Sequence, residues 1–125
     1  MTSVALVTCR RLPQLSPDDH LLERELRNRG IDVHPVLWDD PSVDWPAFDS
    51  VVIRSTWDYH KRIDEFRSWL IAMEQTGTKL WNPPSLVQWN VHKSYLTALA
   101  AAGIATVPTV LLADSSNVAL TFVNA

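Results

Sequence analysis

Residues 51–66, VVIRSTWDYHKRIDEF, decide the fold class, because an apolar strand changes there into a polar segment and then into a charged helical stretch. Residues 51–53 are β-branched and apolar, which is typical of a strand buried on both faces. Residues 54–59, which follow at once, all carry hydrogen-bonding side chains. The stretch therefore predicts a core strand whose end carries polar groups.

The alternation of strand and helix continues upstream. Residues 4–8 form an apolar run that predicts another strand covered on both faces. A helix is predicted to begin at Ser16, a capping residue followed by a proline and two acids, and to end at Gly30. Residues 31–37 and 50–54 complete a set of three strands.

Downstream, apolar side chains recur at helical spacing and predict a second helix that ends near Gly77. These side chains are Phe66, Trp69, Leu70 and Met73. Residues 79–81 predict a short fourth strand, and residues 107–112 predict a further one. Residues 91–102 predict a third helix, whose inward-facing side chains are Tyr95, Leu96 and Leu99.

This alternation predicts an α/β domain with a mainly parallel sheet. Numbered along the chain, the strands are expected in the order 2-1-3-4, with helices on both faces. Ligands bind such sheets outside the carboxyl ends of the strands. Those ends are residues 8–10, 38–40 and 54–58, so we expect a binding edge where these polar tips meet.

Composition and charge argue against several classes of protein. A chain of 125 residues with 46% hydrophobic and 20% charged residues suits one folded domain. The net charge of −3 and dispersed basic residues argue against nucleic-acid binding, and no apolar run approaches the ~18 residues of a membrane span. A single cysteine and no recognisable secretory signal predict a cytoplasmic location, and no Cys or His pair has zinc spacing.

The three glycines, Gly30, Gly77 and Gly103, are all predicted to end helices. None remains for a glycine-rich loop that cradles phosphate, and neither dinucleotide nor Walker motif is present. A nucleotide site would therefore lie mostly beyond residue 125. Residues 1–112 are expected to form the domain, and residues 113–125 to begin a connection to a further one.

Three segments together resemble the N-terminal, pre-ATP-grasp part of ATP-grasp ligases, in the glutathione-synthetase-like branch that includes the cycloserine-forming ligase. They are VLWDDPSVDW (36–45), RSTWDY (54–59) and WNPPSLVQWNVHKSYLTALAAAGIATVPTV (81–110). The similarity extends over residues 3 to about 112. RSTWDY is fairly specific in this context, whereas the third segment is generic to ATP-grasp proteins.

The resemblance implies a small Rossmann-like, three-layer domain of a carboxylate–amine ligase. The whole protein would use ATP and Mg²⁺ to activate a carboxylate as an acyl phosphate, which an amine then attacks. Most ATP contacts and the Mg²⁺ ligands would belong to later domains, so this fragment is expected to be inactive alone and to hold neither tightly. Lys93 matches the family lysine that reaches an ATP phosphate, although it is equally typical of a solvated helix.

The RSTWDY segment supplies most of the candidate substrate-binding residues. Arg54 can clamp a substrate carboxylate, or form a structural ion pair with Asp58 or a nearby loop acid. Ser55 and Thr56 can donate hydrogen bonds to substrate, but one of them is expected to cap the next helix. Asp58 can bind a substrate amine, or serve as the N-cap of that helix.

Two further candidates lie outside this segment. Arg10 follows the first strand and can touch the ligand, and Asn82 is either a simple turn residue or faces the cleft. No catalytic or metal-binding residue is predicted.

Several neighbouring residues are expected to be structural. Trp57 can wall a pocket, but a place in the core is favoured, and Cys9 is expected as a small buried filler rather than a nucleophile. Asp39 and Asp40 can bind a cation, but a turn before Pro41 explains them well.

The predicted partners are a small-molecule carboxylate and amine and the remaining domains of the same polypeptide, and a homodimer is a further possibility. A non-catalytic Rossmann-like binding or dimerisation module is the alternative, because the six tryptophans could anchor an interface.

Overall fold

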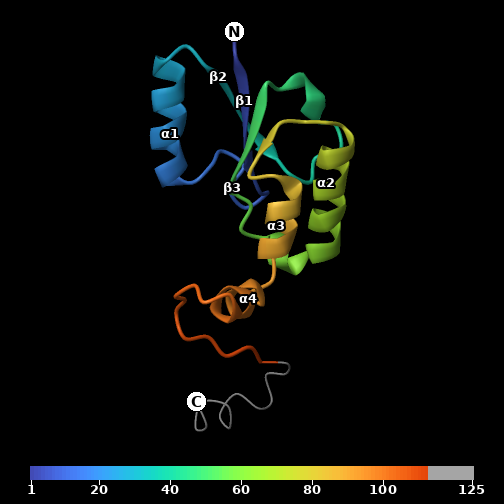
Figure 1. The fold of residues 1–125 in the computed structure, drawn as a ribbon. Helices are drawn as coiled ribbons and strands as arrows, with labels where there is room; N and C mark the ends of the chain where they lie inside the picture. Colours follow the sequence, from blue (N-terminus) through green and yellow to red (C-terminus); the bar gives the residue numbers. More distant parts are fainter. Residues whose placement is uncertain (113–125) are drawn as a thin grey trace. The chain divides into compact units, whose positions relative to one another are not determined.

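A computed structural model describes residues 1–112, and Figure 1 shows their fold. The chain divides into two compact units, Met1–Gln88 and a second that begins at Trp89. The first unit contains a parallel sheet of four strands, β1 (Ser3–Thr8), β2 (Asp32–Leu37), β3 (Ser50–Ser55) and β4 (Leu80–Trp81). Their order, β2-β1-β3-β4, confirms the prediction.

Helix α1 (Pro17–Asn28) covers one face of the sheet. Its N-cap is Ser16, as predicted, whose side chain accepts a hydrogen bond from the backbone N–H of Asp19. Apolar side chains of α1 pack on a buried cluster from β1, β2 and the loop before the helix. The cluster is Val4, Leu6, Leu15 and Val33, and Leu22 and Leu26 of α1 contact it.

Helix α2 (Ile63–Gln75) lies on the opposite side of the sheet (Figure 1). Its four predicted inward residues, Phe66, Trp69, Leu70 and Met73, are all buried. Trp38, which follows β2, packs edge-on against Phe66 with ring centroids 5.3 Å apart. The core on this face is thus strongly aromatic, and it holds the end of β2 against α2.

The connections between these elements contain two short 3-10 helices, η1 (Trp45–Ala47) and η2 (Tyr59–Lys61). The helix η2 bridges the end of β3 and the start of α2. It therefore belongs to the polar segment that follows the third strand.

The region after β4 differs from the prediction. Helix α3 (Pro84–Asn90) was not predicted, although proline in the first turn is favourable because it has no N–H to leave unpaired. Helix α4 (Tyr95–Ala101) begins four residues later than expected. Its three predicted inward residues, Tyr95, Leu96 and Leu99, are only half-buried.

The predicted strand at residues 107–112 is not formed, and the side chains of this segment are exposed. A strand requires a neighbour that supplies hydrogen-bond partners, and nothing in the described part of the chain pairs with these residues. The predicted connection at 113–125 lies outside the described residues. Within residues 1–112, no helix combines the length and apolar character needed to cross a membrane.

Candidate functional site

The carboxyl ends of β1, β2 and β3 lie side by side, which confirms the predicted meeting of polar tips. Thr8 at the end of β1 pairs with Leu37 of β2 and with Ser55 of β3. The register between β1 and β3 shifts after Val7, which leaves Arg54 as an extra residue in β3. A bulge of this kind re-aims the side chains at a strand end, and here Arg54 and Ser55 bind the same acid.

That acid is Asp19, in the first turn of α1. Arg54 Nε donates to Asp19 Oδ1 at 2.7 Å, and Ser55 Oγ donates to Oδ2. The Asp19 side chain is 4% exposed, whereas 40% of Arg54 remains exposed. Arg54 therefore has a structural ion pair, with an acid of α1 rather than with Asp58 or a loop residue.

The pKa of Asp19 reflects two opposing effects. Burial alone raises it, but hydrogen bonds with Ser55, Arg54 and Ser16 outweigh burial and hold the pKa below its ordinary value. Asp19 is thus a buried carboxylate that stays ionised because its partners surround it.

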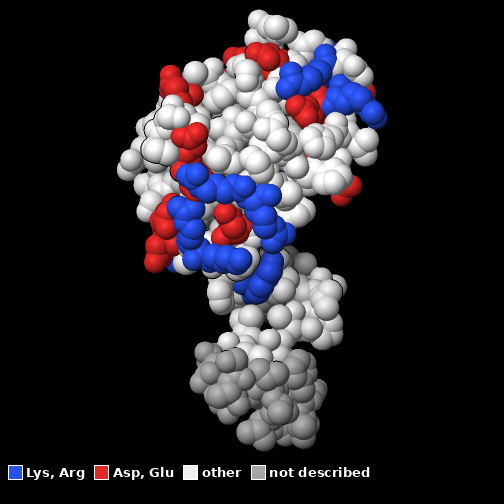
Figure 2. Space-filling model, turned by 180° about the vertical axis from the view of Figure 1, so that it is seen from behind, with Lys and Arg blue, Asp and Glu red and all other residues white. Residues whose placement is uncertain are grey.

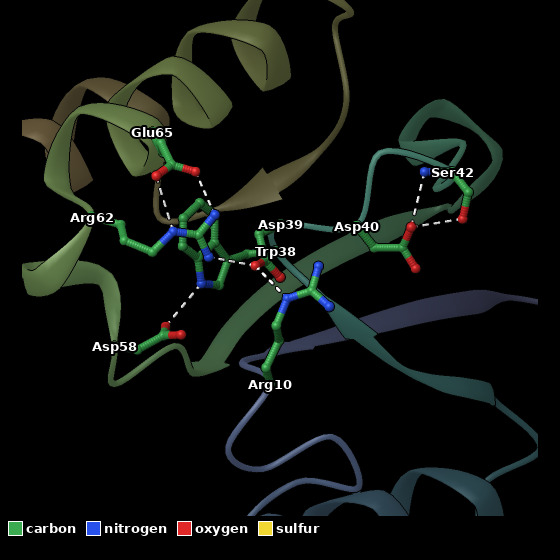
Figure 3. A network of polar contacts seen from close by, with 8 residues as sticks. All are labelled: Arg10, Trp38, Asp39, Asp40, Ser42, Asp58, Arg62 and Glu65. Carbon is green, nitrogen blue, oxygen red and sulfur yellow. Dashed lines mark hydrogen bonds and ion pairs between the residues drawn. The ribbon is translucent and has the colours of Figure 1, made fainter.

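A second network ties the other two strand ends to α2 (Figure 3). Arg10 Nε donates to Asp39 Oδ2 at 2.8 Å, and Arg62 Nη1 reaches the same oxygen at 2.5 Å. Arg62 also pairs with Glu65, and its guanidinium lies 4.9 Å from the ring centroid of Trp38. Arg62 therefore holds the loop after β2 and the first turn of α2 together.

Asp39 is the acid that both arginines of this network share, and its side chain is 3% exposed. Burial alone raises its pKa, but hydrogen bonds from Arg62 and Arg10 prevail and lower it. The pKa of Arg62 is raised by its hydrogen bonds with Glu65 and Asp39. The neighbouring Asp40 accepts hydrogen bonds from the backbone and side chain of Ser42, which confirms the predicted turn.

The polar residues after β3 do not cap the following helix, contrary to the prediction. Asp58 accepts a hydrogen bond from Trp38 Nε1 at 3.0 Å, and no side-chain cap forms at η2 or α2. Ser55 is engaged with Asp19, and Thr56 is 5% exposed. Tertiary partners have displaced the local capping bonds that the sequence favoured.

Residues that follow β1 and β3 enclose a cavity of about 40 Å³, here called the Arg11–Lys61 cavity. It is lined by Cys9, Arg11, Trp57, Asp58, His60 and Lys61. Cys9 is buried, as predicted, at 1% exposure. Trp57 was expected in the core, but it is 52% exposed, because Trp38, Phe66 and Trp69 already fill the aromatic core.

The remaining two candidates lie apart from these networks. Asn82 is exposed and follows β4 with φ of 63°, a left-handed conformation that asparagine tolerates well, which suits a turn residue. Lys93 is an exposed residue of the second unit, and its Nζ lies 5.5 Å from the ring centroid of Tyr95.

Sequence reasoning missed four charged residues at these strand ends, Arg11, Asp19, Lys61 and Arg62. Asp19 looked like an ordinary acid at a helix start, where it suits the helix dipole. Nothing in the local pattern indicated that it would bind residues 35 and 36 positions away. For Arg11, the available signal was its position directly after Arg10, a residue already predicted to lie at a strand end. For Lys61, the signal was its position two residues after Tyr59, the last residue of the RSTWDY segment.

Figure 2 shows Lys and Arg side chains gathered around acidic ones on one face of the molecule.

Among the described residues, no group of three His, Cys, Asp or Glu side chains could hold a metal ion.

Comparison with known proteins relates this arrangement to a particular ligase. Residues 4–82 match the family model described as D-cycloserine synthetase DcsG, N-terminal domain. The chain belongs to this family. The matched range excludes Lys93 and contains all the other candidates, Arg10, Arg54, Ser55, Thr56, Asp58 and Asn82.

A sequence match and a structure match support the family relationship. The chain is 35% identical, over 117 residues, to the cycloserine biosynthesis protein DcsG of Streptomyces lavendulae, covering 94% of this chain and 39% of that protein. It also matches the crystal structure of D-cycloserine synthetase DcsG, with a TM-score of 0.77, 35% identity, and coverage of 86% of this chain and 36% of the other. The chain thus spans well under half the length of these DcsG relatives.

Proposed function

We propose that this chain is the substrate-binding N-terminal domain of an ATP-dependent ligase that joins a carboxylate to an amine. Membership of the DcsG N-terminal family carries the proposal, because the family model and the matched crystal structure are both named for D-cycloserine synthetase. The matches to the cycloserine biosynthesis protein and to the crystal structure cover 94% and 86% of the chain. The fold supports a place of binding at the carboxyl ends of the strands, where ligands of parallel sheets commonly sit. Three such ends meet here.

Residues 1–112 offer no phosphate-cradling loop and no group of carboxylates for Mg²⁺. All three glycines, Gly30, Gly77 and Gly103, have positive φ at the ends of helices, so none forms a phosphate-cradling loop. Within residues 1–112, no carboxylate cluster of metal-binding type is present. In the proposed ligase, ATP and Mg²⁺ bind chiefly to other domains, and Lys93 is the residue of this chain that would approach a phosphate.

The contribution of this domain is therefore to position the substrate. The networks around Asp19 and Asp39 hold the strand ends against α1 and α2. Rigid strand ends keep the binding groups in fixed places, which lowers the entropic cost of aligning reacting atoms. A single buried cysteine, Cys9, suits the reducing cytoplasm, where we place this ligase.

The test uses the natural polypeptide that carries this domain, purified whole. It is incubated with Mg²⁺-ATP and pairs of candidate amino and hydroxamic acids, and ADP release and condensed products are measured. D-cycloserine is the first product to look for, because the relatives are named for it. We expect ADP release that depends on the acceptor; a protein that binds ATP but turns over no pair would contradict the proposal.

A further inference from the structure

The Arg11–Lys61 cavity lies where the proposed function places the substrate. Cys9 and Arg11 follow β1, Trp57 and Asp58 follow β3, and Lys61 ends η2. The cavity is therefore formed by the carboxyl ends of two adjacent parallel strands. This is the edge of such sheets at which ligands bind.

Arg11 and Lys61 differ from the other basic residues at these strand ends. Arg10 and Arg62 are paired with Asp39, and Arg54 is paired with Asp19. Arg11 and Lys61, by contrast, form no ion pair with any of residues 1–112, and both are exposed. Their positive charges are available to an anion that enters from solvent.

The size of the cavity limits what can enter. A volume of about 40 Å³ exceeds the ~30 Å³ share of one liquid water, and accommodates one small anionic group rather than a nucleotide. A guanidinium beside an ammonium suits a carboxylate, because the guanidinium can donate two parallel hydrogen bonds.

Asp58 restricts the charge of the ligand further. Its carboxylate lines the cavity and is fixed by the hydrogen bond from Trp38 Nε1. A fixed negative charge opposes a doubly charged phosphate more than a singly charged carboxylate. It also favours a ligand that carries an ammonium group beside its carboxylate.

We propose that the Arg11–Lys61 cavity binds the carboxylate of an amino acid, with Arg11 and Lys61 as donors and Trp57 as an exposed aromatic wall. That this amino acid is a ligase substrate rests on the proposed function. The cavity itself is a property of the chain, and it can be tested without any ligase reaction.

The experiment titrates the 125-residue chain with D-serine at millimolar concentrations and follows backbone amide chemical shifts. D-serine methyl ester, which lacks the carboxylate, and inorganic phosphate are titrated in parallel. We expect saturable shifts for residues around the cavity with D-serine only. No saturable shift with D-serine, or equal binding of the ester or of phosphate, overturns the proposal.

Matched variants assign the binding to named residues. Arg11→Met and Lys61→Met each remove one hydrogen-bonding charge, and each is expected to weaken D-serine binding by about tenfold or more. Arg24→Met, which removes an exposed arginine of α1 that does not line the cavity, is the charge-matched control. Affinities unchanged in both cavity variants, or lowered equally by the control, overturn the assignment.

The outcomes separate the two proposals. Specific D-serine binding by the chain, together with a whole protein that performs no ligation, would leave the cavity standing and reject the ligase. Ligation by the whole protein with KM values unchanged by Arg11→Met and Lys61→Met would reject the cavity and keep the ligase.

Discussion

Individual residues at the strand ends illustrate how burial determines which charge is structural. Asp19 and Asp39 are almost fully buried acids, and each is held by at least one arginine that stays partly exposed. Such arrangements are strongly sensitive to the loss of one partner, because the remaining buried charge keeps its desolvation cost. Arg54, Arg10 and Arg62 therefore each have a structural role as the partner of a buried acid, whatever else they bind.

Arg54→Met is expected to lower the free energy of unfolding by about 1–2 kcal/mol, because it removes a charged hydrogen bond from the buried Asp19. The value stays modest because 40% of Arg54 is exposed to solvent. Urea unfolding measures it, with Arg24→Met as the control. In the double variant with Asp19→Asn, part of the loss should be recovered; an unchanged stability with a raised KM in the whole protein would instead assign Arg54 to the substrate.

Acid is expected to destabilise the chain through Asp39. Its folded-state pKa lies below the ordinary value of 3.8, so its contribution is complete above that pH and is lost as the pH falls through the folded-state pKa. Asp39→Asn should lower stability at neutral pH and flatten the decline below about pH 4. Unfolding in urea over a pH series measures this. Asp64→Asn, which alters a 95% exposed acid, should leave the decline nearly unchanged.

At the scale of elements, helix ends and strand ends respond to different forces. The start of α1 follows a local rule, since Ser16 accepts a hydrogen bond from the Asp19 backbone N–H. The segment between β3 and α2 does not, because Asp58 and Ser55 bond to Trp38 and Asp19 instead of capping. Local rules predicted the elements well where no distant partner competed.

Ser16→Ala is expected to cost about 1 kcal/mol of stability, because it removes the cap of α1. Thermal or urea unfolding of the variant measures the loss. Ser68→Ala is the matched control, since the hydroxyl of Ser68 bonds only to the carbonyl of Asp64 in its own helix. Equal effects of the two substitutions would show that the cap contributes nothing particular.

The elements also show where an apolar pattern is insufficient. The four apolar residues of α2 were correctly predicted to face inward: Phe66, Trp69, Leu70 and Met73. The strands that come directly before and after α2 in the sequence, β3 and β4, belong to the sheet that this helix covers. Residues 107–112 carry an equally apolar pattern but have no strand partner in the described chain, and they remain exposed. An apolar segment is expected to be buried, but it forms a strand only where a neighbouring strand is available to pair with it.

At the scale of the whole molecule, the alternative function makes a distinct prediction. The exposed tryptophans Trp57, Trp81 and Trp89 are the residues that a dimerisation module would bury. For a ligase domain, we expect sedimentation equilibrium to give a monomer of 14.1 kDa. A tight dimer, with tryptophan fluorescence that changes on dilution, would contradict this and favour the assembly function. Trp81→Ser and Trp89→Ser would then show which surface mediates it.

The sequence alone determined the α/β class, the order of four strands, both ends of α1, the end of α2, and the edge of the sheet where the polar strand ends meet. These follow from periodicity, capping and chain connectivity, which act over a few residues or depend on handedness. Only the tertiary structure decided that Asp19 binds Arg54, that Asp39 joins Arg10 to Arg62, and that Trp57 faces solvent. Such pairings depend on how elements distant in sequence meet across a buried sheet, where the cost of an unpaired charge selects partners that no local pattern encodes.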